Sequence, residues 1–167
     1  MPATHADIDD FLAQRRIAMV GVSRSPHDFS RSLFRELCAK GYDVVPVNPS
    51  AQDIEGKQSF ARVQDIVPQV DAALIITAPG QTEQVVRDCA EAGVRRVWMH
   101  RGGGQGSVDA KAVAFCNKNG IRLVEGHCPF MFLPETSFFH RVHGFVLKIT
   151  GKYPEAKAAS FCGKHEA

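Results

Sequence analysis

Short apolar runs alternate along the chain with segments whose apolar residues recur every three or four positions. The runs have the length and composition of strands buried in a parallel sheet, and the other segments have the spacing of amphipathic helices. The runs predict strands at 17–20, 43–47, 71–77, 96–99 and 121–124. The other segments predict helices at 7–14, 30–39, 82–92 and 107–119, and a short helix around 62–67.

The alternation of strands and helices predicts the fold class and the domain organisation. It is typical of an α/β, doubly wound, mostly parallel five-stranded sheet with helices on both faces. Ser107 is the predicted N-cap of the last helix. We expect a single domain over 1–153, in which 126–153 is an aromatic extension packed on one edge, and a flexible tail over 154–167.

Composition narrows the class of protein. With 44% hydrophobic and 23% charged residues, the chain resembles an ordinary globular domain, and a net charge of +2 gives no reason to expect a nucleic-acid or membrane partner. No apolar run approaches the roughly 18 residues of a membrane span, and the N-terminal residues lack the features of a secretory signal. We therefore expect a cytoplasmic protein. The five cysteines include no CxxC pair, which argues against a disulfide framework.

The loop after the first strand, GVSRSPHDFS, is the first candidate ligand site. In doubly wound sheets, ligands bind beyond the carboxyl ends of the strands. Gly21 allows close approach of a ligand to the backbone, and the helix that begins near Ser30 would offer free N–H groups to a phosphate. Ser23 and Arg24 add polar contacts. The alternative is an ordinary loop between a strand and a helix, in which glycine and serine are common.

Two features of the sequence weigh against a dinucleotide. The glycine pattern GxGxxG is absent, because Val22, Ser23 and Arg24 follow Gly21. The second strand ends in Val-Asn-Pro and not in the acidic residue that would bind the ribose of NAD.

Two further strand ends carry loops with candidate chemistry. Thr77-Ala78-Pro79 follows the third strand and would give the crevice a wall of small residues. His100, Arg101 and three glycines follow the fourth strand, and this pliable backbone would fold over a ligand or form a surface turn.

Four blocks, VGVSRSP, GYDVVPVNP, ALIITAP and VWMHRG, resemble the small bacterial CoA-binding proteins of the YccU type. These are stand-alone relatives of the CoA-binding Rossmann domain in the α subunit of succinyl-CoA synthetase. The resemblance covers residues 8 to 125 and implies a Rossmann-like domain that binds coenzyme A or an acyl-CoA. A neutral Asn48 at the end of the second strand suits the 3′-phosphate of CoA, which an acidic residue would repel.

The resemblance also implies which residues contact the cofactor. The nucleotide end would lie at the carboxyl edge of the sheet, and the thioester end would point toward His100 and the loop after it. The synthetase's phosphorylated histidine lies in a second domain that a chain of this length lacks, so we expect a binding module with no catalytic residue and no metal ligand. The implied contacts are Gly21, Val22, Ser23, Arg24, Asn48, Pro49, Thr77, Ala78, Pro79, Met99, His100 and Arg101.

The histidine- and phenylalanine-rich segment near the C-terminus leaves alternatives open. His140 and His143 share one helical face, and with His127 and Cys128 they are potential metal ligands. The alternative function is an NADP-linked or metal-assisted enzyme that uses His100, His127 and Cys128. The phenylalanines would otherwise form an apolar cap on the fold or the interface of a homodimer.

Overall fold

The structure is a computed structural model that describes residues 3–102 and 106–133. The helices are α1 (His5–Leu12), α2 (Phe29–Ala39), α3 (Pro79–Glu91) and α4 (Ala110–Lys118), with two 3-10 turns, η1 (Val63–Asp65) and η2 (Pro129–Met131). The strands of the main sheet are β1 (Arg16–Val20), β2 (Asp43–Val47), β5 (Ala72–Ile75), β6 (Arg96–His100) and β7 (Arg122–His127). A small hairpin is formed by β3 (Asp53–Ile54) and β4 (Lys57–Gln58).

The five main strands are all parallel and follow the order β2-β1-β5-β6-β7. The predicted doubly wound sheet is confirmed. From β1 the chain first adds β2 on one side and later adds β5 on the other, so the strand order reverses between β1 and β5. In such sheets this switch point leaves a crevice beyond the carboxyl ends of the two strands.

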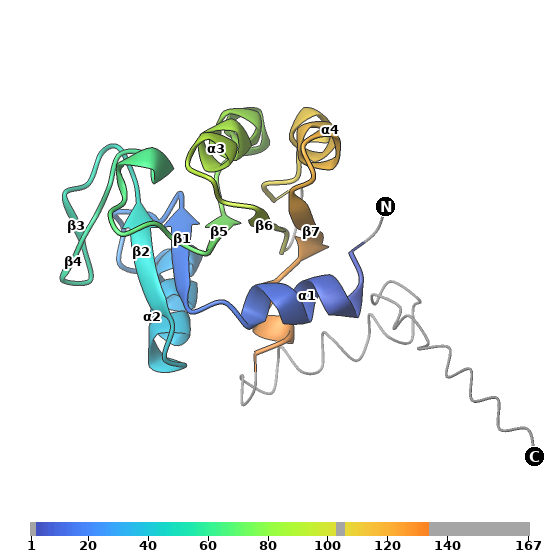
Figure 1. The fold of residues 1–167 in the computed structure, drawn as a ribbon. Helices are drawn as coiled ribbons and strands as arrows, with labels where there is room; N and C mark the ends of the chain where they lie inside the picture. The colour runs from blue at the N-terminus through green and yellow to red at the C-terminus, as the bar shows by residue number, and fades with distance from the viewer. Residues whose placement is uncertain (1–2, 103–105, 134–167) are drawn as a thin grey trace, which may run out of the picture.

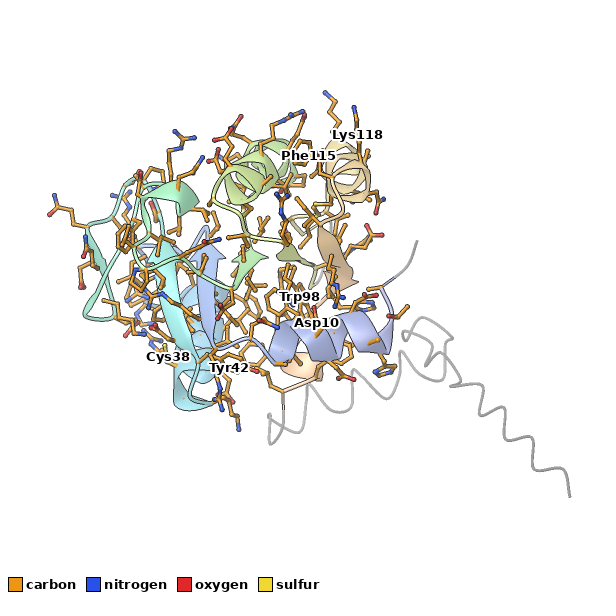
Figure 2. The ribbon with its side chains drawn as sticks, in the orientation of Figure 1. Asp10, Cys38, Tyr42, Trp98, Phe115 and Lys118 are labelled. Carbon is orange, nitrogen blue, oxygen red and sulfur yellow. The ribbon has the colours of Figure 1, made fainter. Side chains whose placement is uncertain are left out.

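Helices cover both faces of the sheet (Figure 1). Alternate residues of each strand point to opposite faces, so Met19 and Trp98 pack toward α1 and α2, whereas Val20 and Met99 pack toward α3 and α4. Figure 2 shows Trp98 in the layer between the sheet and α1, where its ring centroid lies 5.2 Å from that of Phe11. The two apolar layers hold the strand ends, and thus the site, in fixed positions.

The edge strand β2 contains a proline, and a neighbouring segment covers it. Pro46 has no N–H to donate, which an edge strand tolerates. Its carbonyl oxygen accepts a hydrogen bond from the Phe60 N–H at 3.0 Å, and the Asn48 N–H donates to the Phe60 carbonyl at 2.9 Å. The short hairpin before Phe60 turns through Glu55 and Gly56, both with positive φ. Strands of two residues are too short for the apolar pattern to predict them.

All four helices start within three residues of the predicted positions, and the two largest differences have a clear physical reason. Helix α3 begins at Pro79 and not at Thr82, because proline fits the first helical position, where no N–H is required. The N-cap of α4 is Asp109, whose Oδ1 accepts from two backbone N–H groups at 2.9 Å. Ser107 is buried instead, with its Oγ 2.8 Å from the Ile75 carbonyl oxygen and 3.0 Å from that of His100. It joins the ends of β5 and β6.

The predicted C-terminal extension is described only in part. Residues 126–127 belong to β7, and Cys128, Phe130 and Leu133 join the apolar cluster beneath α1 and α2. Residues 134–153, with the predicted tail over 154–167, lie outside the described residues. Within the described ranges, no helix has the length and apolarity needed to cross a bilayer.

Candidate functional site

A pocket of about 550 Å³ lies at the carboxyl edge of the sheet, at the switch point. Its walls come from the ends of β1 and β2, from the segment before η1, and from the first three turns of α3. This volume is within the range of small-molecule sites. The lining residues are Val20, Gly21, Val47, Asn48, Pro49, Ser50, Ala61, Arg62, Val63, Thr77, Gly80, Gln81, Gln84, Val85 and Asp88.

Gly21 lies where the first strand turns into its loop, with a φ of +95°. A Cβ built there would lie 3.0 Å from both the backbone nitrogen and the Cγ2 of Thr77. The glycine is therefore required by its own backbone conformation and by the neighbouring strand end, in addition to any ligand. Both residues line the pocket.

The N-terminus of α2, expected to bind a phosphate, holds a carboxylate of the protein itself. Asp28 is the N-cap, and its Oδ1 accepts from the Ser30 N–H at 2.8 Å and from the Ser30 Oγ at 2.6 Å. The Ser30 Oγ in turn accepts from the Ser23 N–H at 2.9 Å. A negative charge in this position already satisfies the helix end and would repel an anion. The structure therefore does not support the expectation of an anion at this helix end.

The N-terminus of α3 is different, because no side chain caps it. Its N-cap is Ala78, its first residue is Pro79, and the next two residues, Gly80 and Gln81, line the pocket. A Cβ added at Gly80 would meet no atom within 4 Å, so the space beside this helix end is open. A helix of 13 residues carries a partial positive charge at such an end. This end of α3 is the part of the pocket best suited to an anion.

Asn48 joins two walls of the pocket. Its Nδ2 donates to the Val22 carbonyl oxygen at 2.8 Å, and its Oδ1 accepts from the Ser50 N–H at 2.8 Å. The side chain thus fixes the loop after β1 against the loop after β2. The pocket receives no negative charge from the end of β2, which distinguishes it from a typical NAD site.

A charged pair forms the wall farther along α3. Asp88 is 8% exposed, and its Oδ1 accepts from Arg62 at 3.0 Å and from the Gln84 Nε2 at 2.9 Å. Burial acts to raise the pKa of Asp88, but the hydrogen bonds from Arg62 and Gln84 outweigh it, so the pKa lies below its usual value. The Arg62 side chain is 55% exposed to solvent. Sequence reasoning missed all three residues; the one available signal was the i, i+4 spacing of Gln84 and Asp88.

The twelve residues predicted to contact the cofactor lie in different parts of the structure. Ala78 and Pro79 begin α3 beside the pocket, Ser23 and Arg24 lie in the first loop, and Arg101 is exposed after β6. Val22, Met99 and His100 are buried, with Met99 on the α3 and α4 face and His100 on the opposite face. Four of the twelve line the pocket, namely Gly21, Asn48, Pro49 and Thr77.

His100 and His127, two residues of the alternative enzyme, are partners in register at the ends of β6 and β7, but their rings pack on different side chains. The ring of His100 packs on Phe29, whereas that of His127 packs on Phe132 at 5.8 Å. Burial raises the pKa of the Cys128 thiol to about 11, which keeps it protonated at neutral pH. The described part of the chain contains no group of three or more His, Cys, Asp or Glu side chains placed to hold a metal, and His140 and His143 lie outside it.

Comparison with known proteins gives consistent results. The family model described as "CoA binding domain" matches residues 15–134. The α subunit of ADP-forming acetate–CoA ligase II from Pyrococcus furiosus is 28% identical over 72% of this chain, a match that spans only 28% of that subunit. The uncharacterized protein YneT of Bacillus subtilis is 24% identical over 74% of this chain and 89% of its own length.

Solved structures share the fold. A conserved hypothetical protein from Pyrococcus furiosus is 30% identical, with a TM-score of 0.63 over 68% of this chain and 95% of that one. A hypothetical protein from Pyrococcus horikoshii superimposes with a TM-score of 0.71 over 88% of this chain and 96% of that one, at 24% identity. With the family model matching most of its length, this chain belongs to the CoA binding domain family.

Proposed function

We propose that the chain binds CoA or an acyl-CoA in the pocket at the switch point and catalyses no reaction by itself. The observation that carries this proposal is the meeting of a pocket of about 550 Å³ with the uncapped N-terminus of α3. Pro79 has no N–H and the Gln81 N–H donates to the Ala78 carbonyl oxygen at 2.9 Å, so this helix end offers an anion the Gly80 N–H together with a partial positive charge. In a member of a CoA binding domain family, the diphosphate of CoA is the natural occupant.

The rest of the nucleotide has suitable surroundings. Gly80 and Gln81 would contact the diphosphate, and the guanidinium of Arg62, which is paired with Asp88 and partly exposed, lies at the adjoining wall. Val63 and Val85 offer apolar surface to the adenine ring. The neutral Asn48 places no charge against the 3′-phosphate.

The absence of chemistry by the chain itself is also part of the proposal. In the described residues, the side chains around the pocket provide one carboxylate, Asp88, and that carboxylate is already paired with Arg62. The acetate–CoA ligase subunit belongs to an enzyme named for a reaction of CoA, but the match spans 28% of that subunit. A role of delivering or holding CoA for another domain or protein agrees with this partial coverage.

The test is a ligand panel on the purified chain by isothermal titration calorimetry and thermal shift. The panel contains CoA, acetyl-CoA, adenosine 3′,5′-bisphosphate, NAD+ and NADP+. We expect binding and stabilisation by the first three, with about 2.7 kcal/mol of stabilisation at a ligand concentration near 100 times Kd. Binding of NADP+ without binding of CoA would overturn the proposal in favour of a dinucleotide enzyme.

A further inference from the structure

His100 is a buried histidine at the end of β6. The residue is 7% exposed, and its Nε2 finds no hydrogen-bond partner among the described residues. Leaving a buried polar atom unpaired is energetically unfavourable. Such atoms are rare in folded proteins, and each calls for a physical explanation.

The imidazole lies directly beneath two exposed residues. The ring of Phe29, at the start of α2, has its centroid 5.0 Å from that of His100, and this phenylalanine is 41% exposed. A Cβ added at the exposed Gly102 would lie 3.3 Å from the His100 Cε1 and 3.7 Å from the Nε2. Phe130 packs on the other side of Phe29, with ring centroids 5.8 Å apart. The Phe29 side chain and the Gly102 backbone thus form the one layer between the imidazole of His100 and solvent.

The position of His100 relates this cluster to the pocket. His100 ends β6, and β6 lies two strands from β1 and next to β5, whose following helix offers the open end at Gly80. With strands about 4.8 Å apart, the cluster lies roughly 10 Å from β1 along the same edge, on the α2 face of the sheet. The pantetheine arm of CoA is longer than this span. A ligand with its diphosphate at α3 can thus cross the edge and reach His100.

We propose that His100, Phe29 and Phe130 form a second subsite that receives the sulfur end of the pantetheine arm, with the His100 Nε2 hydrogen-bonding a neutral polar group there. This inference rests on the proposed CoA-binding function. Phenylalanine rings suit the methylene groups of the arm, and the Nε2 suits its amide or thioester. The Phe29 ring packs on the imidazole in this structure, and its exposed side chain turns aside when the arm enters.

The electrostatics of the cluster support a neutral ligand group. Burial lowers the pKa of His100, so its imidazole is uncharged at pH 7. A neutral imidazole has no charge to pair with a carboxylate and can hydrogen-bond an amide or thioester. The arm of an acyl-CoA contains amide groups and ends in a thioester, all of them uncharged.

The test compares two ligands, one with the arm and one without it. Acetyl-CoA and adenosine 3′,5′-bisphosphate share the nucleotide end, and their affinities are measured by calorimetry for the wild-type chain and for His100→Phe. We expect the variant to fold normally, since the substitution removes an unpaired polar atom. We expect about fivefold weaker acetyl-CoA binding, the effect of one hydrogen bond, with unchanged binding of the bisphosphate.

Two further variants make the result specific. His127→Phe is the matched control, because this histidine pairs with His100 in register but packs its ring on Phe132; it should leave the affinity ratio of the two ligands unchanged. His100→Gln keeps a hydrogen-bonding group and should restore part of the loss. A side-chain 15N resonance that is absent from His100→Phe should shift on addition of acetyl-CoA and not of the bisphosphate.

The outcomes separate this inference from the function on which it rests. If the wild-type chain binds both ligands equally, or if His100→Phe leaves their affinity ratio unchanged, the subsite is refuted while CoA binding stands. If the wild-type chain binds neither ligand, the proposed function fails, and the subsite fails with it.

Discussion

Gly80→Glu should make the protein more stable and a poorer CoA binder. Gly80 is the second residue of α3, it is exposed, and a side chain added there meets no atom. Glutamate has the higher helix propensity, and its charge is favourable at a helix N-terminus. Together these effects contribute about 0.5–1 kcal/mol, or a rise in Tm of roughly 2–4 °C.

The carboxylate introduced by Gly80→Glu would repel the diphosphate of CoA. Two unit charges about 6 Å apart interact by ~0.7 kcal/mol in water and by ~2.8 kcal/mol at an effective dielectric constant near 20. These values correspond to a loss of CoA affinity between about threefold and a hundredfold. Calorimetry gives the affinity and thermal unfolding gives the stability. The loss should shrink in about 1 M salt, where charges are screened within roughly 3 Å.

Two control variants isolate the cause. Gly80→Ala adds a side chain without charge and should keep most of the affinity. Ala110→Glu adds the same charge in the first turn of α4, at an exposed position outside the pocket lining, and should not affect CoA binding. If Gly80→Glu bound CoA as tightly as Ala110→Glu does, the diphosphate would not lie at α3, and the placement of the ligand would be refuted.

Three other predictions follow from single residues. Gly21→Ala should destabilise the chain by at least 1–2 kcal/mol in urea unfolding, because of its positive φ and the 3.0 Å approach to Thr77; wild-type stability would contradict the strain. The lowered pKa of Asp88 stabilises the fold above the unfolded pKa near 4, and this stabilisation is lost as pH falls through the folded value. Asp88→Asn should therefore flatten the fall of Tm below about pH 4. If the variant's Tm fell with pH as the wild-type Tm does, Asp88 would be excluded as a source of the acid sensitivity. Burial raises the pKa of Cys116 to about 12 and that of Cys128 to about 11, so both should resist iodoacetamide at pH 8 until the chain unfolds; peptide mass spectrometry would expose early labelling.

Local patterns predicted the elements because each strand and helix depends on residues close in sequence. The buried strands at β1, β5 and β6 appear as apolar runs, and the helices appear as apolar residues three or four apart. The predicted N-cap of α4, Ser107, was wrong because Ser107 and Asp109 both have side chains that can cap a helix. The burial of Ser107 between two strand ends, a tertiary contact, decided between them.

The candidate site was also predicted only in part from the sequence. The rule that ligands bind at the carboxyl ends of parallel strands identified Gly21, Asn48 and Thr77 as neighbours, and all three line the pocket. The pairing of Arg62 with Asp88 joins residues 26 positions apart, and no local pattern encodes it.

The sequence by itself determined the parallel doubly wound sheet, because hydrophobic periodicity and the order of strands and helices along the chain specify this fold class. Only the tertiary structure decided which helix end is open to an anion. Asp28 caps α2, whereas α3 has no side-chain cap and borders the pocket. The physical reason is that an anion site requires N–H groups left unpaired in three dimensions, and every side chain that folds near them competes for those groups.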